Sequence, residues 1–256
     1  MALNPLHQFE VIPLHPLVLG GFDLSITNQT LWTGIGVASV ILIMLMGTLR
    51  MAMVPGRWQA FVEITFEFIQ NLTEKTAGRE AMAFFPLIIT TFLFIAALNL
   101  IGMVPHSFTA TSQITTTAYM GIMVFILIVT VGVYKQGLHF FAMFVPHGTP
   151  WWLLPLMVPL EIISFLVRPA TLAVRLAANM VAGHVLLKVF AAFCIMLLGL
   201  TLDGGGSLNY ALAPSAVVPL IVLVAITALE VFVALLQAYI FTVLTCVYLN
   251  QSIHGH

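Results

Sequence analysis

Ionisable residues are rare in this sequence, and several of them stand inside long apolar stretches. Of 256 residues, 61% are hydrophobic and only 7% are Asp, Glu, Lys or Arg. Glu161, Arg175 and His184 lie in one apolar stretch, and Glu230 lies in another. An ionisable side chain at membrane depth costs about 2.5 kcal/mol or more, so the default interpretation is functional. The chemistry that these residue types predict is movement of a proton or another cation.

Helical spacing divides these residues between two sides. At about 100° per residue, five of them project within about 80° of one another, provided that Pro169 does not break the helix. They are Glu161, Arg168, Thr171, Arg175 and Asn179. His184 and Lys188 project from roughly the opposite side, while Glu230 and Gln237 share one face of the second stretch.

The residue types predict a barrier between two relays. Arginine stays protonated because its pKa lies above about 12, so Arg175 cannot pass a proton on. Carboxylates and imidazole can. We therefore predict relay groups on two sides of a fixed positive charge. For Arg168 and Lys188 a structural role remains open, either as snorkelling side chains or as paired ones.

Composition excludes several classes of protein. A soluble domain carries about 25% charged residues, and the mean hydropathy here is +1.11, so neither a soluble globule nor a disordered chain fits. A net charge of -1 with eight Lys and Arg excludes nucleic-acid binding through a basic face. Two Cys and no HExxH motif give no reason to expect a metal or cofactor. Without strand-like alternation, we predict an all-α polytopic membrane protein.

Three apolar stretches have about the 20 residues that cross a bilayer once. They cover residues 31–49, 83–104 and 114–134. Residues 57–75 differ, because aromatic and aliphatic residues recur there at helical spacing and glutamates occupy the other side. That pattern predicts an amphipathic helix on the membrane surface.

Two further apolar stretches are too long for one upright crossing. Residues 151–200 and 214–250 would form helices of about 75 and 55 Å, roughly twice the bilayer. They must be broken or strongly tilted, and the Gly-rich turn at 203–206 joins them into a hairpin. We predict one membrane domain over residues 1–256 with five crossings.

Basic residues outside the last two stretches predict the orientation. They lie in two loops, at Arg50, Arg57, Lys75, Arg79 and Lys135. By the positive-inside rule, those loops and the amphipathic helix face the cytoplasm or matrix, and the N-terminus lies outside.

Two motifs resemble one known family. Residues 168–184, RPATLAVRLAANMVAGH, are similar to the signature of subunit a of the F-type ATP synthase. Residues 236–241, LQAYIF, followed by Leu244-Thr245 and 247–249, VYL, resemble the last helix of that family. Pro105 after Gly-Met-Val and the opening Gln8-Phe9-Glu10 also fit, so the resemblance covers nearly the whole chain.

The resemblance implies a stator that faces a rotating ring of c subunits, each with one membrane-embedded carboxylate. Arg175 would match the arginine that pairs with this carboxylate, with Asn179 and Gln237 as polar groups beside it. Two half-channels would lead protons to and from the ring. Glu161 would match the acid of the inner half-channel, which opens to the cytoplasm or matrix, and His184 and Glu230 would match the pair of the outer half-channel. Polar support would come from Thr171, Arg168 and Lys188. The order of His before Glu in the outer pair resembles the alphaproteobacterial and mitochondrial branch.

The same resemblance implies partners and a location. The partners would be the c-ring, the b subunits of the peripheral stalk, the lipid bilayer and the translocated proton, with sodium the less favoured ion. ATP chemistry would occur on other subunits. The bacterial cell inner membrane is favoured over the mitochondrial inner membrane.

A stand-alone cation or metabolite transporter is the alternative. The sequence has no internal repeat, which disfavours an inverted-repeat transporter. A purely structural scaffold would not need Arg175 and Glu230 at membrane depth.

Overall fold

The chain is almost entirely helical in the computed structural model, which describes residues 9–15, 18–19, 22–23, 25–49, 51–104, 107–137, 140, 152–203 and 217–254. The α-helices are α1 (Asn28–Thr48), α2 (Arg57–Ala77), α3 (Phe85–Gly102), α4 (Ile114–Gln136), α5 (Leu154–Asp203) and α7 (Val217–His254). Two 3-10 helices, η2 (Arg79–Phe84) and η3 (Ala110–Ser112), precede α3 and α4.

Short strands near the N-terminus were not predicted from the sequence. β1 (Pro13–His15) pairs with β4 (Ile26–Thr27), and β2 (Val18–Leu19) pairs with β3 (Phe22–Asp23). Five helices in the described part of the chain are long and apolar enough to cross a membrane. The all-α polytopic fold is therefore confirmed. Among the residues singled out above, Gln8, Arg50, Pro105 and 204–206 lie outside the described ranges.

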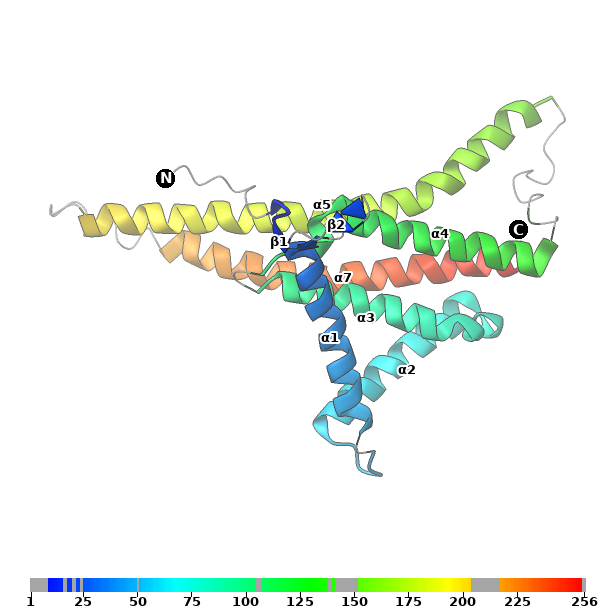
Figure 1. The fold of residues 1–256 in the computed structure, drawn as a ribbon, viewed down its shortest axis with the longest axis horizontal. Helices are drawn as coiled ribbons and strands as arrows, with labels where there is room; N and C mark the ends of the chain where they lie inside the picture. The colour runs from blue at the N-terminus through cyan, green and yellow to red at the C-terminus, as the bar shows by residue number, and fades with distance from the viewer. Residues whose placement is uncertain are drawn as a thin grey trace.

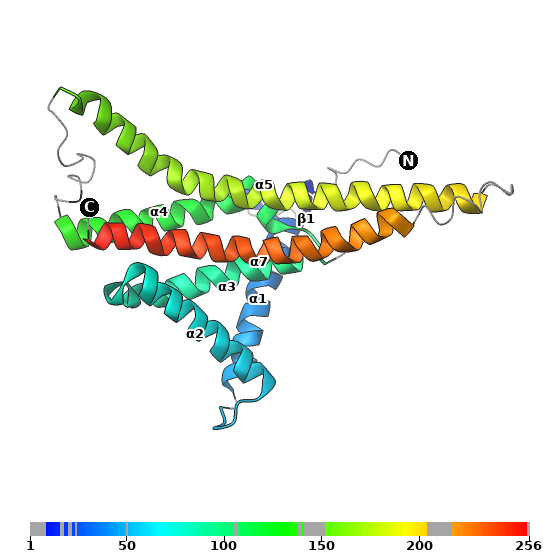
Figure 2. The ribbon, with the colours of Figure 1, turned by 180° about the vertical axis from the view of Figure 1, so that it is seen from behind.

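The two longest helices lie side by side and α1 runs across them. Helices α5 and α7 pack along each other, while α3 and α4 flank α7 (Figures 1 and 2). Helix α1 leaves this layer at a steep angle and carries α2 at its far end. Helices that cross so steeply cannot all stand upright in one bilayer.

Helix α5 is continuous for 50 residues, although it contains Pro159 and Pro169. Proline removes one backbone hydrogen bond and bends a helix, and the N-terminal part of α5 diverges from α4 and α7 (Figures 1 and 2). Because the helix continues through Pro169, the helical register assumed across this residue is preserved. A straight helix of this length would span about 75 Å, and its strong tilt in a hydrocarbon layer of about 30 Å stays a prediction.

The core fixes which face of α5 is buried. Leu172 and Leu176 of α5 join one apolar cluster with residues of α3, α4 and α7. At Gly121 of α4, an added Cβ would lie 2.9 Å from the carbonyl oxygen of Pro169, so only glycine allows this approach. The middle of α5 is therefore locked against α4 and α7 by one side, and the residues on its other side stay exposed.

Helix α2 is not among the five candidate spans. One side of it packs on α1, α3 and α7 and buries Val62, Ile69 and Thr73. Trp58 and Phe61 remain exposed. Part of the apolar surface of this amphipathic helix thus contacts protein, and its contact with the membrane stays a prediction.

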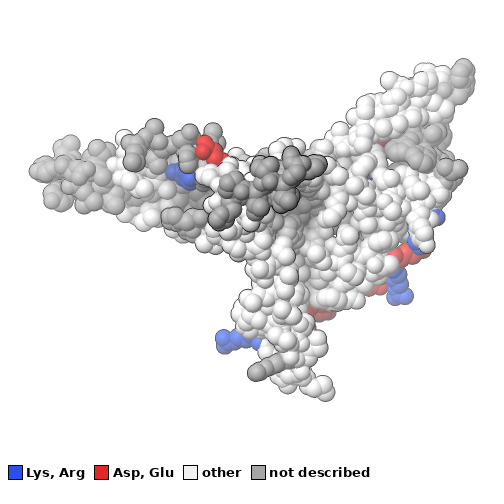
Figure 3. Space-filling model, in the orientation of Figure 1, with Lys and Arg blue, Asp and Glu red and all other residues white. Residues whose placement is uncertain are grey.

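Charged side chains gather toward the edges of the molecule, and the broad middle of the face in Figure 3 is largely uncharged. Two ion pairs cluster near α2 and the end of α4. Arg79 Nε lies 3.1 Å from Glu74 Oε1, and Lys135 Nζ lies 3.0 Å from Glu80 Oε2. The two loops that the positive-inside rule assigns to one side therefore meet at one end of the molecule.

Candidate functional site

His184 and Glu230 face each other between α5 and α7. His184 Nε2 lies 3.8 Å from Glu230 Oε1, and the Glu230 side chain is only 6% exposed. Neither carboxylate oxygen of Glu230 has a hydrogen-bond partner among the described residues. A buried carboxylate without such partners depends on a nearby positive charge or on protonation. The imidazole of His184, 3.8 Å away, is close enough to supply either.

Gly183 makes this approach possible. A Cβ at this position would lie 2.6 Å from Glu230 Oε1 and 2.9 Å from its Cδ. These distances are shorter than any ordinary non-bonded contact. The absence of a side chain at Gly183 therefore sets how closely the Glu230 carboxylate approaches α5.

Thr109 is the residue at this site that the sequence did not indicate. Its Oγ1 lies 3.0 Å from His184 Nε2 and 3.1 Å from the carbonyl oxygen of Gly102, to which it donates. The ring of Phe9 contacts His184 edge-on, with 6.4 Å between ring centroids. No spacing rule could connect Thr109 with a histidine 75 positions later, because the contact depends on how η3 packs between α3 and α5.

His184 borders a pocket of about 760 Å³ that adjoins α1, α3, α5, α7 and the N-terminal segment. Lys188 lines the same pocket and is exposed. Other polar residues of the lining are Glu10, Asn28, Ser107 and Thr227. The side of α5 that carries His184 and Lys188 therefore faces a cavity whose largely apolar lining includes several polar side chains.

A second group of polar residues lies nearer the start of α5. Arg168 places Nη2 3.7 Å from Glu161 Oε1 and donates from Nη1 to Gln251 Oε1 at 2.7 Å. The guanidinium also lies over the ring of Tyr248, 5.5 Å from its centroid. Arg168 is thus a structurally paired residue that ties Glu161 of α5 to the end of α7.

Arg175 lies between these two groups on the exposed side of α5. Its position is seven residues after Arg168 and nine before His184, or about 10 and 14 Å along the axis. Within the described residues its side chain makes no hydrogen bond or ion pair. A guanidinium at membrane depth that has no partner among the described residues of its own chain calls for an anionic partner from outside it.

The remaining predicted residues do not join a cluster. Thr171 is exposed and its hydroxyl donates to the backbone oxygen of Arg168 at 2.8 Å. Asn179 is half-buried. Gln237 is buried and its Nε2 has no partner in the described part of the chain. Within the described residues, neither Asn179 nor Gln237 makes a hydrogen bond or an ion pair with Arg175.

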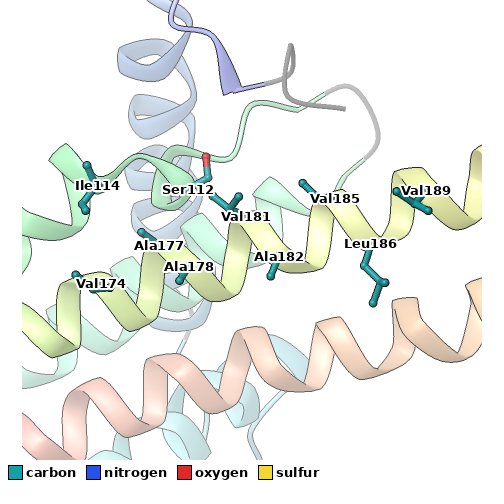
Figure 4. A pocket seen from close by; sticks show the side chains of 10 residues that line it. All are labelled: Ser112, Ile114, Val174, Ala177, Ala178, Val181, Ala182, Val185, Leu186 and Val189. Atoms are coloured by element: carbon teal, nitrogen blue, oxygen red, sulfur yellow. The ribbon is translucent and has the colours of Figure 1, made fainter. Parts of the chain in front are cut away.

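An apolar groove of about 720 Å³ follows α5 from Val174 to Val189 (Figure 4). Small side chains, including Ala177, Ala178 and Ala182, form its floor, and Ser112 and Ile114 stand beside it. Among the described residues that line it, Ser112 alone is polar. This surface offers no chain of relay groups from one polar cluster to the other.

Among the residues that the structure describes, no three His, Cys, Asp or Glu side chains come together in a way that could hold a metal ion. The candidate site therefore consists of the His184–Glu230 pair, the Glu161–Arg168 pair and the isolated Arg175 between them.

Comparison with known proteins identifies the family to which the chain is similar. The model of the family described as ATP synthase A chain matches residues 30–250. ATP synthase subunit a from Rhizobium leguminosarum is 47% identical over 258 residues, which cover 100% of both chains. The subunits a from Agrobacterium fabrum and Rhodopseudomonas palustris are 46% and 44% identical and cover 99 to 100% of each chain. A match of this extent shows that the chain belongs to the ATP synthase A chain family, the subunit a of F-type ATP synthases.

Proposed function

We propose that this chain is the proton-translocating stator of an F-type ATP synthase and that two half-channels end on either side of Arg175. The observation that carries the proposal is the unpartnered guanidinium on the exposed face of α5. It lies between two ion-paired groups that project from different sides of the helix.

The outer half-channel is formed by the pocket beside His184 and by the His184–Glu230 pair. Both side chains can bind and release a proton, and 3.8 Å between Nε2 and Oε1 allows transfer after a small rotation. The pocket brings water-accessible volume to His184. Lys188, on its wall, is a polar support residue.

The inner half-channel is formed around Glu161. Its carboxylate accepts a proton leaving the ring, and Arg168 holds it in place through the contacts with Gln251 and Tyr248. An ionised carboxylate is the form that accepts the next proton.

The partner that Arg175 requires is a carboxylate on each subunit of a c-ring. When protonated, that carboxylate can face lipid at tolerable cost, and when ionised it is stabilised by the guanidinium. Protons cannot pass Arg175 because it neither gives up nor relays a proton under ordinary conditions. Each proton must therefore travel with the ring from one half-channel to the other. Asn179, Thr171 and Gln237 supply polar contacts along this route.

The membrane potential supplies the driving force. Moving one charge across 100 mV releases about 2.3 kcal/mol, which the ring converts to torque. ATP chemistry takes place on other subunits of the complex, and b subunits of the peripheral stalk hold the stator in place. The proton is favoured over sodium as the ion. The multi-pass chain resides in an energy-coupling membrane, with the bacterial cell inner membrane favoured by its relatives.

A stand-alone cation or metabolite transporter is the competing function, and reconstitution separates the two. Vesicles that contain this chain alone and vesicles that contain it with its c-ring are compared for proton flux under an imposed potential. We expect flux only when both are present, because Arg175 blocks direct passage. Equal flux from the chain alone would refute the stator function and support the transporter.

A further inference from the structure

The hydroxyl of Thr109 lies within hydrogen-bond distance of two groups. They are His184 Nε2 at 3.0 Å and the carbonyl oxygen of Gly102 at 3.1 Å. Thr109 is 5% exposed, so water does not readily replace either partner. Its backbone is also fixed, because its carbonyl accepts hydrogen bonds from the Ser112 amide and hydroxyl at 3.1 and 2.6 Å.

The hydroxyl group of Thr109 has a single hydrogen, and the carbonyl oxygen of Gly102 is the acceptor that needs it. A carbonyl oxygen can only accept, so Thr109 must be the donor toward Gly102. The hydroxyl of Ser107 is the other donor near Gly102, at 3.0 Å, but it lies closer to the carbonyls of Ile101 and Val104, both at 2.7 Å. The hydrogen of Thr109 is therefore used on Gly102, which leaves its oxygen lone pairs for His184.

We propose that Thr109 is a positioning residue that keeps the hydrogen of neutral His184 on Nε2 and leaves Nδ1 as the atom that takes up a proton. When Glu230 is ionised, its charge favours the same arrangement, because its Oε1 lies 3.8 Å from the same Nε2. Uptake then adds one proton at Nδ1 and gives an imidazolium that still directs Nε2–H at Thr109 and Glu230. This inference rests on the proposed role of His184 in the outer half-channel.

The test uses matched variants in the assembled ATP synthase, with passive proton flux measured in vesicles stripped of the catalytic head. Thr109→Val keeps the shape of the side chain and removes the hydroxyl. Loss of one hydrogen bond of ordinary strength should slow the flux about three- to tenfold. Thr109→Ser restores the hydroxyl and should restore the flux. Thr111→Val is the control, because the Thr111 hydroxyl is buried on η3 without a partner in the described residues.

A double variant separates positioning from a structural role. If Thr109 acts through His184, Thr109→Val should change nothing further in a His184→Gln background. A further loss there, a normal flux in Thr109→Val, or no rescue by Thr109→Ser would each overturn the inference. A normal flux in His184→Gln alone would instead refute the proposed role of His184.

The position of the hydrogen on His184 can also be measured by spectroscopy, which does not require a Thr109 variant that assembles. Nitrogen-15 NMR of the histidine-labelled complex distinguishes an imidazole protonated on Nε2 from one protonated on Nδ1. The His184 signal is identified by its loss in His184→Gln. We expect the neutral ring to carry its proton on Nε2, and a proton on Nδ1 would overturn the inference.

Discussion

Gly183→Ala should slow proton uptake through the His184–Glu230 pair without preventing assembly. The new Cβ would lie 2.6 Å from Glu230 Oε1 and 2.9 Å from its Cδ. Relaxing both to ordinary contacts of about 3.3 to 3.6 Å requires a shift of roughly 0.7 Å. Oε1 lies 3.8 Å from His184 Nε2, so a shift of this size away from α5 carries the carboxylate out of reach of the imidazole.

The expected loss of passive proton flux in Gly183→Ala is about tenfold or more, since misplacing a reacting group by 1 Å can cost about a hundredfold. The assay measures flux in vesicles stripped of the catalytic head, together with the amount of assembled complex. Alanine favours a helix over glycine by about 1 kcal/mol, so the helix itself should not suffer.

The control for this prediction is Gly34→Ala. Gly34 also lies inside a membrane helix, but a Cβ there meets no heavy atom within 4 Å. Gly34→Ala should conduct normally. Normal flux in Gly183→Ala, or an equal loss in both variants, would refute the claim that the approach of Glu230 to α5 sets the rate.

Two further predictions concern the His184–Glu230 pair and the packing of α4 on α5. The exchange His184→Glu with Glu230→His should recover more flux than either half alone, and simple additivity in the double-mutant cycle would show that the two residues do not communicate. Gly121→Ala should lower the free energy of unfolding of the complex by about 1 to 3 kcal/mol, because the added Cβ would lie 2.9 Å from the Pro169 carbonyl oxygen. The measurement is the melting temperature, and an unchanged value would contradict the close packing of α4 on α5.

Periodicity predicted which residues share a face but not which residues touch. The 3.6-residue repeat was enough to set Arg175 and His184 on different sides of one helix, and α5 is continuous across Pro169 as that argument required. Apolar length was enough to predict overlong helices. These features depend on local geometry, which the sequence encodes directly.

Contacts between distant segments could not be predicted in this way. Arg168 reaches Gln251 across 83 positions and Thr109 reaches His184 across 75. Both pairs depend on how the tilted helices cross, and no spacing rule describes that. The short N-terminal strands were missed for a related reason, since each has only two or three residues and too few positions to show alternation.

The role of Arg175 as a barrier and as partner of the ring carboxylate is the central claim. It is tested most directly by measuring ATP synthesis and passive proton flux side by side in Arg175→Ala. The variant should assemble and should make no ATP from a proton gradient. Passive flux through the stripped membrane sector should persist or rise, because a protonated ring carboxylate can then pass the gap.

Arg175→Lys is the matched variant for the same measurement, because it keeps a positive charge. It should not restore ATP synthesis, since a desolvated ammonium can release its proton and lacks the planar fork of the guanidinium. Near-normal ATP synthesis in Arg175→Ala would contradict the account.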